Sequence, residues 1–351
     1  MTNTLTTEEF AGQVVGDVAA AMSGVMTALG HKLGLYKAMA GAGWQTPDAI
    51  AAASGTFERY VREWLGNQVA GGYIQFDEAS NRYQLPDAFL PVLVNTDSPM
   101  FLVPALEVAA SLWLDEEKLL SAFKTGEGIS WGQHHHRLFC GSESLFRPGY
   151  KAFLVDEWLQ AVDGLTDRLK AGATVADVGC GHGASTILLA NAFPQSRFMG
   201  YDLHEESIRT ASERAREDGN PDNLEFVVSD AKSYDGESFD LICFMDCLHD
   251  MGDPVGAARH ARSKLKSGGV ALLVEPAAGN SLGDNCHPVG RLYYAASTAV
   301  CTPCSHSQEV KAGLGAQAGP ARLSAVMQEA GFSRVEQVAA TPFNIILAAY
   351  A

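Results

Sequence analysis

A glycine-rich turn is the stretch of this chain best suited to hold a ligand. The sequence G-C-G-H-G at 179–183 follows a β-branched run that contains Asp177 and precedes a helix-forming run, Ala184 to Ala190. A strand, a glycine-rich turn and a helix begin a nucleotide-binding unit, because glycines lack the Cβ atoms that would block a sharp turn or a close ligand. The spacing is neither the G-x-G-x-x-G of a dinucleotide site nor the Gly-Lys-Ser/Thr of a phosphate-binding loop. It therefore indicates a nucleoside with a small, charged tail.

Two further carboxylates end the next two predicted strands. Asp202 ends the run Ser196–Asp202, about 20 residues after the glycines, where a carboxylate accepts both ribose hydroxyls of a nucleoside. Asp230 ends the run Leu224–Asp230. Ligands of open α/β sheets lie at the carboxyl ends of the strands, so these side chains should share one site with the glycine turn. An acid after the second strand also fits a nicotinamide site, which the glycine spacing disfavours.

This set of motifs resembles that of class I S-adenosylmethionine-dependent methyltransferases. The resemblance implies S-adenosylmethionine as cofactor and S-adenosylhomocysteine as product, with the glycine turn beside the methionine part. It also implies that Asp177 orders the loop and faces the ammonium group, and that Asp230 accepts a hydrogen bond from the adenine amine. We expect the cofactor to contact Asp177, Gly179, Cys180, Gly181, Gly183, Asp202, Leu203, Asp230, Ala231 and Asp246.

A polar segment, M-D-C-L-H-D-M, follows the fourth predicted strand, Phe239–Met245. Methyl transfer is an in-line displacement, so placement of the nucleophile dominates its rate. A hydroxyl nucleophile needs a base, and His249 suits that role at neutral pH, with Asp250 or Asp246 holding its tautomer. The L-H-D segment resembles the catalytic segment of small-molecule O-methyltransferases of the caffeate and phenazine type, except that Met251 replaces their usual Trp. The alternative is a loop histidine bonded to a backbone carbonyl.

The segment 276–319 joins the fifth predicted strand, Gly268–Glu275, to the last predicted helix. Connections of this length are usually lids or binding loops. A second aromatic-rich segment, 98–167, is expected to be helical, to link two domains and to cover the pocket. From these two segments we expect substrate contacts by Phe146, Tyr150, Arg291, Tyr293 and Tyr294.

Cysteine and histidine residues raise the question of a metal site. The lid segment contains Cys286, Cys301, Cys304 and His306, which could bind zinc or a thiophilic substrate such as a trivalent arsenical. A single C-x-x-C with one nearby histidine is a weak signal, so we expect buried, reduced thiols and no metal. The run His134 to His136 places its side chains in different directions, and a solvated loop is the favoured interpretation.

The first hundred residues have the pattern of a winged helix. Helices are predicted over Asp48–Ser54 and Phe57–Val69, and two short strands then flank a polar turn. The second helix carries Arg59 and Arg62 beside two glutamates, whereas a helix that contacts DNA should be visibly basic. The caffeate-type enzymes also place a winged-helix dimerisation domain first, so a dimer contact is favoured over DNA binding.

Strands and helices alternate from residue 168 onwards, which is typical of a doubly wound sheet. The last two apolar runs, 333–338 and 344–350, are too close for a crossover helix and should form an antiparallel hairpin. The predicted fold is α/β: a seven-stranded, doubly wound (Rossmann-like) methyltransferase sheet with a terminal antiparallel hairpin, after a mostly α winged-helix domain. The predicted domains are 1–97, the linker and pocket cover 98–167, and the methyltransferase domain 168–351 with its lid 276–319.

Composition limits the class of protein. The chain has 351 residues, seven cysteines and a net charge of −16, which argues against a broad nucleic-acid surface. No signal peptide and no span of about 18 uninterrupted apolar residues is visible. We therefore expect a cytoplasmic homodimer that methylates a small-molecule acceptor. The alternatives are a DNA-binding regulator that senses S-adenosylmethionine, and an N-, C- or S-methyltransferase that depends on a thiol or a metal.

Overall fold

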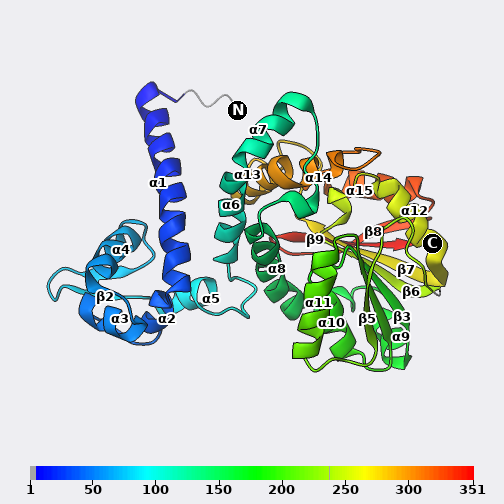
Figure 1. Cartoon of the computed structure of the whole chain (residues 1–351), viewed down its shortest axis with the longest axis horizontal. Coiled ribbons are helices and arrows are strands. Elements are labelled where there is room, and N and C mark those ends of the chain that lie inside the picture. Colours follow the sequence, from blue (N-terminus) through cyan, green and yellow to red (C-terminus); the bar gives the residue numbers. More distant parts are fainter. Residues whose placement is uncertain (1–4, 237) are drawn as a thin grey trace. The chain divides into compact units, whose positions relative to one another are not determined.

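The computed structural model describes residues 5–236 and 238–351. The chain divides into two compact units: Met1–Ala110 with Arg137–Gly149, and Ser111–His136 with Tyr150–Ala351. The division therefore falls inside the predicted linker, 98–167, and assigns parts of that segment to each unit. Figure 1 shows the elements of both units.

The first unit is mostly helical and contains one small hairpin. Its elements are α1 (Thr7–Lys32), α2 (Leu35–Met39), α3 (Pro47–Ser54), α4 (Glu58–Ala70), β1 (Gln75–Asp77), β2 (Arg82–Gln84), η1 (Asp87–Phe89), α5 (Leu90–Leu93), α8 (Arg137–Gly149) and the first part of α6 (Pro104–Leu114). Strands β1 and β2 pair antiparallel, with Phe76 opposite Tyr83. The order of helices and hairpin is the winged helix that the sequence predicts.

Local sequence explains how these helices begin, and one tryptophan joins them. The Thr46 hydroxyl accepts a hydrogen bond of 3.3 Å from the amide of Ala49, and proline follows at the first helical position of α3. Trp64 of α4 is buried and donates its indole N–H to the Met26 carbonyl of α1 at 2.8 Å. A Cβ on Gly30 would lie 2.5 Å from the Trp64 ring, so glycine is needed where α1 and α4 meet.

Helix α1 is one continuous helix of 26 residues rather than the glycine-interrupted pair that its sequence allows. Thr6 and Glu9 form a capping box at its start. Among the described residues, α1 alone is long and apolar enough to cross a membrane, a criterion that helices of soluble proteins and signal sequences also meet. The sequence contains no uninterrupted apolar run of that length, because small and polar residues lie between the apolar residues of α1.

The second unit is built on a seven-stranded sheet with the order β5-β4-β3-β6-β7-β9-β8. The strands are β3 (Thr174–Val178), β4 (Arg197–Asp202), β5 (Leu224–Val228), β6 (Phe239–Met245), β7 (Leu265–Pro276), β8 (Arg334–Ala340) and β9 (Asn344–Tyr350). The first five are parallel, and β9 is antiparallel to both β7 and β8. The predicted sheet and its terminal hairpin are confirmed.

Helices cover this sheet and make its central strands fully buried. They are η3 (Tyr150–Trp158), α9 (Leu165–Ala171), α10 (Ala184–Ala192), α11 (Glu205–Glu217), α12 (Pro254–Lys264) and α15 (Gly319–Glu329). Helices α10 and α11 pack on β4 and β5, whereas α12 and α15 pack on each other and against β7 to β9 (Figure 1). Burial on both faces explains why β6 reads as a continuous apolar run, F-D-L-I-C-F-M, with little alternation.

The two segments predicted to cover the pocket are largely helical. The lid segment, 276–319, contains α13 (Pro288–Ala296), the π-helix η5 (Ser297–Cys301) and α14 (Thr302–His306). The segment 111–136 contains the end of α6, α7 (Glu116–Thr125) and the short turn η2 (Trp131–Gln133). One prediction here is wrong: His134 is buried, whereas the sequence favours a solvated loop for the run His134 to His136, of which His136 is exposed.

Candidate active site

The glycine turn after β3 is shaped by backbone conformation and by close packing. Gly179, Gly181 and Gly183 have φ angles of 76°, 51° and 76°, which favour glycine. A Cβ on Gly179 would lie 2.7 Å from the Cys247 sulfur, and one on Gly183 would lie 2.6 Å from the Phe226 ring. A Cβ on Gly181 would meet no atom within 4 Å. The turn therefore packs against β5 and the β6 loop at its two ends and opens to a ligand at its centre.

Asp202 is held against this opening by backbone amides. The amide of Gly181 donates to Asp202 Oδ2 at 2.9 Å, and the amide of His204 donates to Asp202 Oδ1 at 2.8 Å. Burial raises the pKa of the Asp202 carboxyl, and the two amides oppose that shift. The carboxylate at the end of β4 is thus fixed beside the glycine turn, as the sequence predicts for a group that binds ribose.

Asp177 lies fully buried in β3, beneath the start of α10. The hydroxyls of Ser185 and Thr186 both donate to its Oδ2 at 2.7 Å. Its Oδ1 is buried and has no hydrogen-bond partner among the described residues. Burial raises the pKa of Asp177 to about 6. Its contacts tie β3 to the start of α10, the helix that follows the glycine turn, and its second oxygen remains available to a donor.

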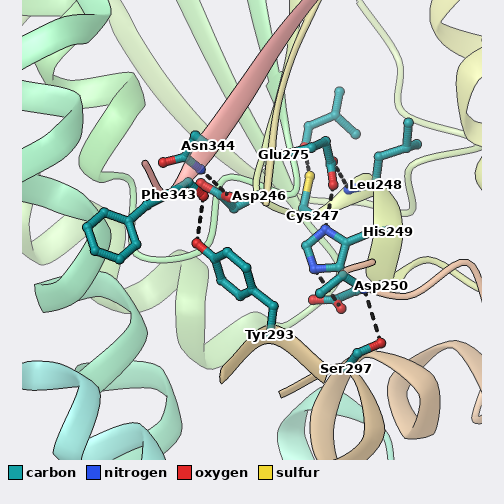
Figure 2. A network of polar contacts seen from close by, with 12 residues as sticks. Asp246, Cys247, Leu248, His249, Asp250, Glu275, Tyr293, Ser297, Phe343 and Asn344 are labelled. Atoms are coloured by element: carbon teal, nitrogen blue, oxygen red, sulfur yellow. Dashed lines mark hydrogen bonds and ion pairs between the residues drawn. The ribbon is translucent and has the colours of Figure 1, made fainter. Parts of the chain in front are cut away.

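Asp246 occupies a left-handed position, with φ 52°, directly after β6. The Tyr150 hydroxyl donates to Asp246 Oδ2 at 2.7 Å. The Asn344 side chain donates to Oδ1 at 2.8 Å (Figure 2). Burial raises the pKa of Asp246 to about 7. Both oxygens are therefore engaged by β9 and η3, and the interpretation that Asp246 holds the tautomer of His249 is wrong.

Glu275 is the partner that orients His249, and the sequence analysis missed this role. His249 lies in the turn η4 (Leu248–Asp250), and its Nδ1 is 2.5 Å from Glu275 Oε2 (Figure 2). Glu275 Oε1 also accepts the amide of Leu248 at 3.0 Å. The signal was present, because Glu275 ends a predicted strand, β7, which neighbours the strand that leads to His249.

His249 lies between two carboxylates. Its Nε2 forms an ion pair of 3.2 Å with Asp250 Oδ1, on the side opposite Glu275. Burial alone would lower the pKa of His249, but the charges of Asp250 and Glu275 outweigh burial and hold this pKa well above its usual value. His249 therefore differs from the unperturbed histidine assumed from the sequence.

A thiol completes this cluster. Ligand atoms of His249, Asp250 and Cys301 all lie within 4.8 Å of one another, a grouping that could hold a metal ion. Three other lid residues were candidates for a metal site. Cys304 is buried and Cys286 is exposed. Nδ1 of His306 lies 3.5 Å from the Gly126 carbonyl oxygen. The observed group thus shares only Cys301 with the C-x-x-C motif.

The predicted substrate residues have different environments. Tyr293 is buried, and its hydroxyl donates to the Phe343 carbonyl at 2.6 Å, beside Asp246 (Figure 2). Tyr150 is buried against Asp246, Tyr294 is half-buried and Arg291 is exposed. Phe146 lies half-buried in α8, in the first unit. Contacts of all five with a substrate stay predictions.

Four predicted cofactor residues contribute in other ways or remain open. Asp230 follows β5, and its Oδ1 accepts the amide of Lys232 at 2.7 Å, so part of this carboxylate shapes its own turn. Cys180 is buried, Ala231 is half-buried, and Leu203 is 64% exposed. The roles of Asp230 and Ala231 toward adenine stay predictions.

Family comparisons match both parts of the chain. Residues 169–330 match a family described as a methyltransferase domain, and residues 21–93 match a family described as an Rv2258c-like winged HTH domain.

Curated relatives match the second part. The 27-O-demethylrifamycin SV methyltransferase of Amycolatopsis mediterranei is 29% identical over 151 residues, which are 41% of this chain and 51% of that protein. A ubiquinone biosynthesis O-methyltransferase of Methylococcus capsulatus is 32% identical over 150 residues, covering 42% of this chain and 60% of that protein. The chain spans about half the length of the curated relatives it matches.

Solved structures resemble the whole chain in fold. An O-methyltransferase-like protein of Nostoc punctiforme has a TM-score of 0.74 at 19% identity, with 97% of this chain and 98% of that chain covered. Human N-acetylserotonin methyltransferase, solved with S-adenosylmethionine, has a TM-score of 0.68 at 17% identity, with 100% and 99% covered. At these identities the likeness describes the fold.

Proposed function

Because the chain carries a methyltransferase domain behind an Rv2258c-like winged HTH domain, as its sequence predicts, we propose that it transfers a methyl group from S-adenosylmethionine to a hydroxyl group of a small molecule. One observation supports this most strongly. Strands β4, β3, β6 and β7 are parallel neighbours, so their carboxyl ends place Asp202, the glycine turn, His249 and Glu275 along one edge of the sheet. A cofactor and an acceptor at that edge would be adjacent.

The residues present fit the proposed cofactor. S-adenosylmethionine supplies a methyl group activated by a sulfonium charge, and its methionine part carries an ammonium group. Asp202 is fixed by two amides beside the glycine turn, where it would accept the ribose hydroxyls, and the unpartnered Oδ1 of Asp177 offers a buried acceptor to a donor group. Open space at Gly181 lets a ligand approach the backbone between them. Proteins of similar fold solved with this cofactor or its product include the human protein above and PigF.

His249 supports an oxygen acceptor in two ways that depend on its charge. Below its raised pKa, the imidazolium can donate a hydrogen bond from Nε2 to the hydroxyl oxygen of the methyl acceptor, which would take the place of Asp250 at that nitrogen. Above that pKa, the same nitrogen can take the hydroxyl proton, and Glu275 stabilises the imidazolium that results. We therefore keep His249 as the general base of the sequence hypothesis, for the pH range in which the ring is neutral. The names of several relatives, which specify O-methyltransferases, agree with a hydroxyl acceptor.

The first unit supports a dimer more than a DNA contact. In α4, Arg59 pairs with Glu63 at 2.6 Å and Arg62 pairs with Glu58 at 2.7 Å, which neutralises the helix that would face phosphates. In α1, Val14, Val18, Met22, Val25 and Leu29 are all more than 40% exposed. Their spacing of four, four, three and four places them on one stripe of the helix. We propose that this stripe is covered by a second copy of the chain.

A methyl-transfer assay tests the proposed function. The purified protein is incubated with methyl-labelled S-adenosylmethionine and a set of phenols, catechols and hydroquinones, and extracted label is counted. Label in an ether-type product from at least one acceptor, lost in a protein with Asp202→Ala, supports the proposal. Label found only in N-methylated or S-methylated products would favour the alternative that the protein is an N- or S-methyltransferase.

A further inference from the structure

Three side chains that can bind metals meet beside the turn η4, and the proposed function gives no role to the thiol among them. His249 and Asp250 lie in that turn, and Cys301 ends the π-helix η5 of the lid. One ligand atom of each lies within 4.8 Å of the other two. His249 and Cys301 are buried, and Asp250 is half-buried. The lid thus brings a thiol to a histidine and a carboxylate that are neighbours in the chain.

The spacing of these atoms is close to that of a tetrahedral metal site. Zinc binds nitrogen and oxygen at about 2.0–2.2 Å and thiolate sulfur at about 2.3 Å, which sets neighbouring ligand atoms about 3.5 Å apart. Nε2 of His249 lies 3.2 Å from Oδ1 of Asp250 in an ion pair. This Oδ1 is buried and has no hydrogen-bond partner among residues 5–236 and 238–351. Small rotations of the side chains would therefore bring all three atoms onto one cation.

Glu275 orients His249 as the outer carboxylate of a metal site does. Its side chain is 1% exposed, and its Oε2 lies 2.5 Å from Nδ1 of His249 (Figure 2). A histidine that binds a metal through one ring nitrogen almost always gives the proton of the other to a carboxylate, a carbonyl or water, which fixes the tautomer. With that proton held on Nδ1 by Glu275, Nε2 is the ligand nitrogen, and it faces Asp250.

Hydrogen bonds between the lid and the loop around η4 hold the thiol in this position. The amide of Gly315 donates to the carbonyl of His249 at 3.1 Å, and the hydroxyl of Ser305 donates to the carbonyl of Met251 at 3.0 Å. Both donors follow Cys301 in the lid. Because the segments that carry the ligands are already joined, little conformational freedom is lost when a cation binds.

The donor set favours zinc over the abundant hard cations. Thiolate and imidazole suit Zn²⁺, whereas Mg²⁺ and Ca²⁺ prefer oxygen ligands. Three protein ligands with a fourth position left to solvent form an open zinc site. Cys304, the second cysteine of the C-x-x-C motif, is buried but lies outside the group of three. The predicted site therefore differs from a C-x-x-C zinc site.

We propose that His249, Asp250 and Cys301 bind Zn²⁺, and that the bound ion blocks methyl transfer. Binding displaces the thiol proton of Cys301 and any proton on Nε2 of His249, and these protons pass to solvent. The ion then occupies Nε2, the atom through which the proposed function holds or deprotonates the acceptor hydroxyl. Binding of the ion stands on the cluster alone, whereas the block of methyl transfer rests on the proposed function.

Absorption spectroscopy with Co²⁺ tests the metal site without any methyl acceptor. The intact protein, with its thiols kept reduced, is titrated with Co²⁺ and then with Zn²⁺. Wild type should show a cobalt–thiolate band that Zn²⁺ removes. The band should be absent in Cys301→Ser and unchanged in Cys304→Ser, the matched control from the same C-x-x-C motif. No band in wild type, a band that persists in Cys301→Ser, or one that is lost in Cys304→Ser would overturn the proposal.

Further variants keep the result from depending on one thiol. Asp250→Asn preserves the side-chain volume and removes a charged ligand, and Glu275→Gln removes the carboxylate behind His249. Each should weaken Co²⁺ and Zn²⁺ binding about 10-fold to 100-fold, the scale reported for partners that support a metal ligand. Circular dichroism shows whether each variant folds. Wild-type metal affinity in a folded Asp250→Asn protein would contradict the assignment of this ligand.

Inhibition of methyl transfer tests the consequence of binding, with the phenol acceptor found in the assay above. The rate of each protein with added Zn²⁺ is divided by its own rate in the presence of a chelator. Zn²⁺ should inhibit wild type over the concentrations that displace Co²⁺, whereas Mg²⁺ should not inhibit. Cys301→Ser should need at least about 10-fold more Zn²⁺ for half-inhibition, and Cys304→Ser should match wild type. Equal inhibition of Cys301→Ser and wild type would overturn the proposal.

The outcomes separate this inference from the function it rests on. If wild type binds Co²⁺ through Cys301 but transfers no methyl group to any hydroxyl, the proposed function fails and the metal site stands. If wild type methylates a phenol and shows no cobalt–thiolate band, the metal site is wrong while the function stands. Activation by Zn²⁺, or a saturated site without inhibition, contradicts the inhibitory role.

Discussion

The amide of Gly181 donates a 2.9 Å hydrogen bond to the carboxylate of Asp202, which lies 21 residues later in the chain. This bond joins the turn after β3 to the end of β4, and it fixes the carboxylate where open backbone lets a ligand approach. It links the glycines to the acid within the proposed cofactor site.

The glycines of the turn should fail in different ways. A Cβ on Gly183 would lie 2.6 Å from Phe226, so Gly183→Ala should destabilise the protein by about 2–4 kcal/mol through strain and overpacking. A Cβ on Gly181 would meet no atom within 4 Å. Gly181→Ala should therefore lower the free energy of unfolding only by the strain of an alanine at positive φ, about 1–2 kcal/mol. Although its effect on stability is small, Gly181→Ala should weaken cofactor binding strongly, because its methyl group would occupy the open space where the ligand is proposed to lie.

Urea unfolding and calorimetric titration of S-adenosylhomocysteine measure these two effects side by side. Gly268→Ala is the control, because Gly268 also has a positive φ, 76°, and open space, and it lies at the start of β7 outside the proposed site. Equal losses of cofactor affinity in Gly181→Ala and Gly268→Ala would show that the turn has no special place in binding.

His249 should make the stability of the protein depend on pH. Its pKa is raised in the folded protein above the usual 6.5. Its contribution is therefore fully present below pH 6.5 and is lost as the pH rises through the folded pKa. His249→Gln should cost about 1–3 kcal/mol at pH 6, and this difference from wild type should shrink at alkaline pH.

Urea unfolding of both proteins between pH 6 and pH 10 measures this difference. His260→Gln serves as a control, because His260 Nε2 lies 2.9 Å from the Tyr234 carbonyl rather than against a carboxylate. A stability difference for His249→Gln that grows with pH would mean that the folded protein holds this ring neutral.

The α1 stripe should hold a dimer together. Replacing Val18 and Met22 by glutamate puts charges on residues that are 53% and 69% exposed in one chain, so the isolated unit should still fold. Because burial of two unpaired carboxylates in an apolar interface is unfavourable, the double substitution should shift the protein from dimer to monomer. Light scattering after size-exclusion chromatography measures the mass. The control is Val310→Glu, on an exposed residue of the second unit; a wild-type protein that is already a monomer would rule the dimer out.

The cluster of His249, Asp250 and Cys301 should not require a metal. Treatment with a chelator should leave methyl transfer unchanged, and Cys301→Ser should retain activity within about 10-fold, because the proposed chemistry uses nitrogen and oxygen groups. Added Zn²⁺ should inhibit, since the three ligand atoms lie within 4.8 Å of one another. Loss of activity on chelation, restored by Zn²⁺, would favour the metal-dependent alternative.

The sequence predicts those features that depend on short segments. The glycine turn, Asp202 and the seven strands follow from local periodicity and from the rule that acids after parallel strands meet at one edge. The antiparallel β8–β9 pair follows from the length of the connection alone. These features could be placed because each depends on residues close together in the chain.

Partners brought together by the tertiary fold could not be predicted in the same way. Glu275 is 26 residues from His249, and Asp115 is 19 residues from His134. The end of a neighbouring predicted strand makes Glu275 one candidate partner of His249, but the local pattern does not select it over Asp246 or Asp250. The balance of burial and those partners raises the pKa of His249 and lowers the pKa of His134, so two histidines that look alike in sequence are shifted in opposite directions.

Calorimetric titration of S-adenosylmethionine and S-adenosylhomocysteine into the wild-type protein and into Asp202→Ala tests the central claim most directly. The account predicts binding of both compounds to wild type in the micromolar range, and at least about 10²-fold weaker binding to Asp202→Ala, because a charged hydrogen-bond acceptor is removed from a buried site. Asp235→Ala, which removes an exposed carboxylate, should bind as wild type does. No binding of either compound to the wild-type protein would contradict the assignment of this edge of the sheet as a cofactor site.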